Sequence, residues 1–202
     1  MKKILIIAAI SAFLWGGCRS SKPVAPTFYT IEYPFERQVA DTLEVLPFTL
    51  EIKDVDVHPV FSSNQIALRE ADNEIKYFVN HQWAARPHQS LERFILAYFN
   101  QNRVFQNVRS RFWDLQPDYQ LYTSIYHLEI VRNKKDFYAR LHLEFRLDDA
   151  QGKTILRHTA DNSRLIESRD LNLFTTAVNN MFFEELNFFA RKMRFEFDPG
   201  SS

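Results

Sequence analysis

The stretch between Phe137 and Leu147 limits the fold more than any other part of the chain, because apolar and polar side chains alternate along it without interruption. Such alternation places the apolar side chains on one face of a β-strand and the polar ones on the other. A sheet with one buried and one wet face is usually antiparallel. We therefore expect residues 121–132 and 154–159 to pair with this strand as hairpins, through turns at 133–136 and 148–152.

Two helices are predicted by apolar residues at helical spacing. The first begins at Pro87, which suits a first helical turn. The second runs from about Asp170, a plausible N-cap, to about Arg194. Its predicted inner stripe consists of Phe174, Val178, Met181, Phe182, Leu186, Phe189 and Met193.

Shorter strands are predicted at 28–33, 48–52 and 104–108, and a hairpin at 65–69 and 74–79. A change of parity after Asp54 suggests a bend before 55–57. This order predicts an α+β fold, with a mainly antiparallel sheet and two amphipathic helices packed on one face.

The composition restricts the classes of function. The 202 residues include 25 basic and 25 acidic side chains, and this balance argues against nucleic-acid binding. Thirty aromatic residues, 19 Phe, 8 Tyr and 3 Trp, supply the core of a single domain. With only four glycines, the sequence offers no glycine-rich phosphate loop, and it indicates no cofactor.

The N-terminal residues have the order of an export signal: Lys2 and Lys3, an apolar run to Leu14, then small residues before Cys18. The apolar run is too short to span a bilayer. Small residues directly before the chain's single cysteine resemble a bacterial lipobox, although Trp15 stands where leucine is usual. We expect a lipoprotein signal peptide at 1–17, an acylated Cys18 with a flexible tether at 18–27, one α+β domain at 28–197 and a tail at 198–202. A plain signal peptide with a chance cysteine is the alternative.

The central hairpin and first helix resemble the ABC-type transport auxiliary lipoproteins, the PqiC-like family. The family pattern has Gln-Ile…Arg on a strand, a turn, a strand with a tyrosine, then Trp-Ala before a proline and an amphipathic helix. The matching residues are Gln65, Ile66, Arg69, Asn73, Tyr77, Trp83, Ala84 and Pro87. One departure is that Ala85 and Arg86 precede Pro87, which shifts the helix start by a residue.

The resemblance implies an accessory subunit of an intermembrane lipid-transport system. Such a subunit is held on the periplasmic face of the outer membrane and works with an MCE-domain protein and with an ABC transporter or integral inner-membrane subunits. It also implies self-association into a ring, and no catalytic residues. The alternatives are a periplasmic lipoprotein that binds a lipid or small molecule in its own cavity, or a scaffold for outer-membrane assembly.

Several side chains have two interpretations at this point. Trp83 either fills the space between hairpin and helix or anchors a partner. Leu173 and Phe183, off the inner stripe of the second helix, either form an exposed partner surface or are buried under a loop. His127 and His142 either meet across strands to bind a metal or lie on a solvated face. The adjacent Glu184 and Glu185 are expected to be solvated helix charges.

Overall fold

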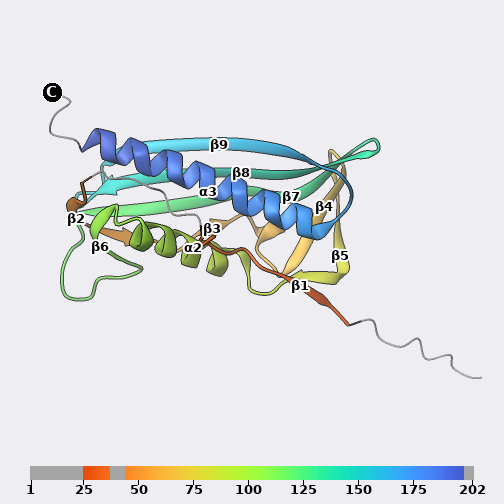
Figure 1. The fold of residues 1–202 in the computed structure, drawn as a ribbon, viewed down its shortest axis with the longest axis horizontal. Coiled ribbons are helices and arrows are strands. Elements are labelled where there is room, and N and C mark those ends of the chain that lie inside the picture. The colour runs from red at the N-terminus through yellow and green to blue at the C-terminus, as the bar shows by residue number, and fades with distance from the viewer. Residues whose placement is uncertain (1–24, 37–43, 198–202) are drawn as a thin grey trace, which may run out of the picture.

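The computed structural model describes residues 25–36 and 44–197, which form one sheet and two long helices (Figure 1). Neither helix of this described part is long and apolar enough to cross a bilayer. The elements, in chain order, are β1 (Thr27–Tyr29), β2 (Leu46–Ile52), β3 (Asp56–Val57), the 3₁₀ turn η1 (Pro59–Phe61), β4 (Gln65–Ala71), β5 (Glu74–Trp83), α2 (Pro87–Gln101), β6 (Phe105–Arg109), β7 (Tyr119–Asn133), β8 (Asp136–Asp149), β9 (Thr154–Ile166) and α3 (Leu171–Glu196).

The α+β class is confirmed, but the prediction of a mainly antiparallel sheet is wrong, because the nine-stranded sheet is mixed. The antiparallel pairs are β4–β5, β7–β8 and β8–β9. On its other side β7 is joined by β2, β3 and β4, all parallel to it, and the pairs β1–β5 and β2–β6 are parallel as well. Alternation within one strand reports which face is dry. It carries no information on the direction of neighbours that arrive from distant parts of the chain.

The central hairpins follow the predicted pattern and extend beyond it. The apolar face of β8 is buried, with Leu141, Leu143 and Phe145 fully inaccessible. The predicted strand at 154–159 continues to Ile166, so β9 pairs with β8 along nearly its full length. Gly152 has φ +79° in the turn between them, a left-handed conformation that glycine adopts without the strain a side chain would bring.

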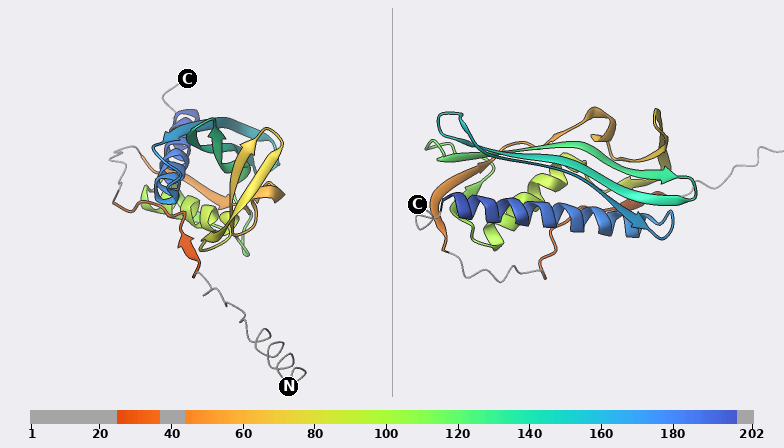
Figure 2. Two further views of the ribbon diagram at one scale, coloured as in Figure 1. Left: turned by 90° about the vertical axis from the view of Figure 1, so that its right-hand side faces the viewer. Right: turned by 90° about the horizontal axis from the view of Figure 1, so that it is seen from above.

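The two helices lie together on the concave side of the curled sheet (Figure 2). Pro87 is the first residue of α2, as predicted, and Asp170 caps α3 by accepting a hydrogen bond from the N–H of Asn172. All seven residues of the predicted inner stripe of α3 are buried. Phe182 packs edge-on against Phe94 of α2, with ring centres 5.0 Å apart. The helices and the apolar sheet face therefore share one aromatic core.

The N-terminal segment differs from the strand predicted at 28–33. Only Thr27–Tyr29 pairs with the sheet, as β1 beside the end of β5. Ile31 and Tyr33 are nevertheless buried, and the Tyr33 ring packs against Phe94. Ile31 and Tyr33 are therefore apolar because they pack in the core, Tyr33 against α2, and not because they belong to a paired strand.

Candidate functional site

The strongest concentration of interacting charges lies on the convex face of the sheet, opposite the helices. Strand alternation places Glu129 of β7 and Arg140 of β8 on this face, and the two are paired in register. His127 and His142 are paired next to them, and His142 is paired in turn with Asp161 of β9. The β7–β8 register shifts between Ile125 and His127, so a bulge precedes the cluster.

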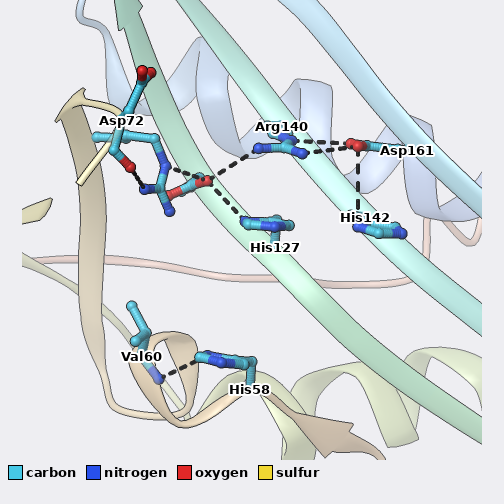
Figure 3. A network of polar contacts seen from close by, with 9 residues as sticks. His58, Val60, Asp72, His127, Arg140, His142 and Asp161 are labelled. Atoms are coloured by element: carbon cyan, nitrogen blue, oxygen red, sulfur yellow. Dashed lines mark hydrogen bonds and ion pairs between the residues drawn. The ribbon is translucent and has the colours of Figure 1, made fainter. Parts of the chain in front are cut away.

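Glu129 is the centre of this network. Figure 3 shows how His127, Arg140, His142 and Asp161 lie in it. Its side chain is 0% exposed. Its Oε1 accepts a hydrogen bond from Arg69 Nε at 2.9 Å and lies 3.0 Å from His127 Nδ1 and 3.8 Å from Arg140 Nη1. Arg69 also donates from Nη1 to the carbonyl oxygen of Asp72. A buried carboxylate is tolerated when cations and donors surround it in this way.

A second carboxylate continues the network towards the edge of the sheet. Arg140 donates to both oxygens of Asp161, at 3.0 and 2.8 Å, which is a bidentate pair. These hydrogen bonds lower the pKa of Asp161 and raise the pKa of Arg140. Asp161 Oδ2 also lies 4.0 Å from His142 Nδ1. Charges of opposite sign therefore alternate from β4 across β7 and β8 to β9.

His127 is held in its neutral form. Burial, followed by the nearby Arg140, lowers its pKa below the usual 6.5, and this outweighs the opposite effect of Glu129. The ring packs against Phe61 of η1 and stacks on His142, with ring centres 5.7 Å apart in both cases. A neutral imidazole beside a carboxylate places its proton on Nδ1, so we assign His127 as the donor to Glu129.

The network holds strands together, and its groups are directed at one another. His127 and His142 each direct Nδ1 to a carboxylate. Within the part of the chain that the structure describes, no group of three or more His, Cys, Asp or Glu side chains is placed to hold a metal ion. Glu129 Oε2 has no hydrogen-bond partner among the described residues. We therefore assign the network a stabilising role.

The predicted family-motif residues fall into structural positions. Arg69 belongs to the charged network, and Tyr77 donates from its hydroxyl to the carbonyl oxygen of Val60 at 3.0 Å. Trp83 is 2% exposed and packs against Phe174 of α3, with ring centres 5.7 Å apart, which supports its core role. Pro87 starts α2, and Gln65, exposed at the start of β4, pairs with Gln82.

The remaining candidate residues separate into three cases. Cys18 lies outside the described residues. Phe183 is only 8% exposed and packs against Tyr33 and Tyr98, so it is buried under the N-terminal segment and does not belong to a surface patch. Leu173 is 40% exposed, so its contact with a partner stays a prediction.

The expectation of solvated charges at Glu184 and Glu185 is confirmed for Glu184, whose side chain is 49% exposed, and is wrong for Glu185, whose side chain is 19% exposed. Glu185 lies 2.6 Å from His158 Nε2 and accepts a hydrogen bond from Asn162 at 2.7 Å, and Glu184 pairs with Arg164. Both glutamates therefore join α3 to the inner side of β9.

The sequence interpretation missed Glu129, Arg140 and Asp161 as a linked group. The available signal was the hairpin register, since pairing Leu121–Arg132 with Phe137–Leu147 brings Glu129 opposite Arg140. The burial of Glu129 had no such signal. It results in part from η1, whose Phe61 packs beside His127 on this face.

A shallow hollow of about 450 Å³ lies between the N-terminal segment and α2. Apolar and aromatic side chains predominate in its lining, among them Ile31, Tyr33 and Phe94, and Arg93 is at its margin. If the chain were a ligand-binding lipoprotein, this hollow would be a candidate site for the lipid or small molecule.

Comparison with known proteins gives a family match and a fold match. The profile of the ABC-type transport auxiliary lipoprotein component family matches residues 29–182, more than half of the 202 residues. A crystal structure of a protein from Xanthomonas campestris is similar with a TM-score of 0.67 at 15% identity, covering 86% of this chain and 95% of that one. An uncharacterised protein has a TM-score of 0.67 at 14% identity, covering 84% and 99%. A hypothetical protein of Chlamydia trachomatis has a TM-score of 0.50 at 9% identity, covering 73% and 96%. Among curated proteins, none matches this chain.

Proposed function

The chain belongs to the ABC-type transport auxiliary lipoprotein family, and from this premise we propose that it is the membrane-anchored accessory subunit of an intermembrane lipid-transport system that contains an MCE-domain protein. The family match over residues 29–182 carries the proposal, because it spans nearly the whole folded domain and associates it with ABC transport components. This family is one of transport auxiliary proteins and not of enzymes. The subunit acts by docking other proteins.

The anchor is the acylated Cys18, which becomes the first residue of the mature chain. More than one acyl chain gives durable attachment to a bilayer. The seven residues from Cys18 to Val24 span at most about 25 Å when extended, so the folded domain stays close to its membrane. This membrane is the outer membrane, and Cys18 is anchored in its periplasmic face. From there the domain faces the transporter subunits.

The docking surface that we propose is the free edge of β9 with Leu165 and Leu173 at its end. β9 has 13 residues, and among the described strands it pairs with β8 alone. An unpaired strand edge of this length can accept a strand from another chain. Leu165, 63% exposed, and Leu173 flank the connection from β9 to α3. The same edge suits self-association into a ring.

The proposal is tested by capture of partners from solubilised envelopes. Photo-crosslinking residues are introduced at Leu165 and Leu173, and at Phe195, exposed near the C-terminal end of α3, as a matched control. We expect the first two positions, and not Phe195, to crosslink to an MCE-domain protein, a transporter subunit or a second copy. Recovery of none of these proteins would contradict the docking function. Lipid copurified inside the monomer would favour a carrier, and a β-barrel partner would favour an assembly scaffold.

A further inference from the structure

The loop between β6 and β7, residues 110–118, exposes large apolar side chains. Trp113 is 84% exposed and Leu115 is half-exposed. The guanidinium of Arg111 lies over the Trp113 ring at 4.9 Å, and that of Arg109 lies over Phe112 at 5.5 Å. The aromatic core and the β9 edge do not involve this loop, so its exposed tryptophan needs another explanation.

The chain leading into the loop carries basic charges only, and the two acidic residues of the loop, Asp114 and Asp118, follow Trp113; Asp118 accepts hydrogen bonds from Thr49. From Arg93 to Trp113 it contains four arginines and no acidic residue. These arginines, Arg93, Arg103, Arg109 and Arg111, are all exposed. Within the described residues none of them forms an ion pair with a carboxylate. Exposed arginines that pair with no carboxylate among the described residues are available to an anionic surface.

The loop and β1, the strand at the end of the tether, lie on the same side of the molecule. Figure 1 shows the loop below the sheet near one end of the long axis and β1 below it towards the other end, with α2 between them. The chain between Cys18 and the first described residue reaches at most about 25 Å. A bilayer that holds Cys18 therefore lies within reach of this side.

We propose that the loop 110–118 rests on the surface of the anionic phospholipid bilayer that holds Cys18, with Trp113 in the interfacial region. Tryptophan favours the headgroup level because its ring is apolar and its N–H is polar. Each exposed arginine near the surface strengthens binding to anionic lipid about fivefold. The acyl anchor and the loop then fix the domain at two points, with its long axis along the membrane. This inference rests on the proposed function in one point only, which is that the acylated Cys18 attaches the domain to a bilayer.

Tryptophan fluorescence tests the proposal directly, since the mature chain from Cys18 onward contains only Trp83, which is buried, and Trp113. The acylated protein is reconstituted in vesicles whose lipids carry bromine on the acyl chains near the headgroup. We expect the Trp113 emission to be quenched. In Trp113→Phe only the Trp83 emission remains, and it is unquenched.

A second arm uses the unacylated Cys18→Ser chain and cosedimentation with vesicles. We expect binding to vesicles with about a quarter phosphatidylglycerol and none to neutral ones. Neutralising Arg109 and Arg111 to glutamine weakens this binding about 25-fold, at about fivefold for each arginine. The matched control, Arg191→Gln with Lys192→Gln on α3, leaves it unchanged.

Failure of the contact between the loop and the bilayer can be distinguished from failure of the Cys18 anchor. Unquenched Trp113 in acylated, vesicle-bound protein overturns the inference and leaves the anchor intact. A mature chain without acyl groups overturns the anchor. The inference then fails if the Cys18→Ser chain also ignores anionic vesicles.

Discussion

Replacing Arg69 by methionine should destabilise the domain severely, because it removes the main counter-charge of the buried Glu129. The hydrogen bond lost is the one at 2.9 Å from Arg69 Nε to Glu129 Oε1. Removing one partner of a buried ion pair costs roughly 3–5 kcal/mol. Arg140 remains at 3.8 Å from the same oxygen, so we expect about 3 kcal/mol.

The assay is urea denaturation of the unacylated chain, followed by circular dichroism and checked by thermal melting. For a domain of this size, a loss of about 3 kcal/mol lowers the melting temperature by roughly 6–12 °C. The matched control is Arg157→Met, which removes the exposed pair with Glu144 and should cost less than about 1 kcal/mol. The double variant Arg69→Met with Glu129→Met should recover about 2 kcal/mol, because no buried charge is left without its partner.

The reasoning would be refuted if Arg69→Met and Arg157→Met lowered the free energy of unfolding equally. It would also be refuted if the double variant were as unstable as the sum of the two single variants. Either result would mean that Glu129 is not held as a buried anion.

Three further predictions concern packing, capping and pH. Trp83→Ala should lower the free energy of unfolding by about 3–5 kcal/mol in urea denaturation, because it leaves a cavity beside Phe174; a loss below about 1 kcal/mol would contradict a core role. Asp170→Ala should cost about 1 kcal/mol in the same assay and Asp170→Asn much less, since both Asp and Asn accept the capping hydrogen bond; equal losses would argue against the cap. Because the pKa of His127 is lowered from 6.5, the unfolded chain binds that proton first as the pH falls, so stability should decrease between about pH 7 and 5, and less so in His127→Gln. The lowered pKa of Asp161 contributes stability that is lost only below about pH 4, outside that window, so identical pH profiles for wild type and His127→Gln would contradict the assignment.

The parts of the fold that could be predicted are those specified by local pattern. The stripe of α3 repeats at helical spacing, and all of its predicted members are buried. The alternation in β8 specified its dry face, and Pro87 specified the start of α2. In each case a few neighbouring residues determine the geometry.

The parts that could not be predicted depend on contacts between distant segments. The parallel joining of β2, β3 and β4 to β7 is determined by the crossing connections. The burial of Phe183 depends on Tyr33, 150 positions earlier, and its place on the helix gave no sign of that contact. The charged network had a readable part, Glu129 opposite Arg140, but Arg69 enters it from β4, whose pairing with β7 was unforeseen.

The anchor at Cys18 is the claim on which the account depends most, and mass spectrometry of the mature N-terminal peptide from isolated envelopes tests it most directly. We predict a peptide that begins at Cys18 and carries covalently bound acyl chains. A mature protein with an unmodified Cys18 thiol, recovered in the freely diffusing fraction, would contradict the account.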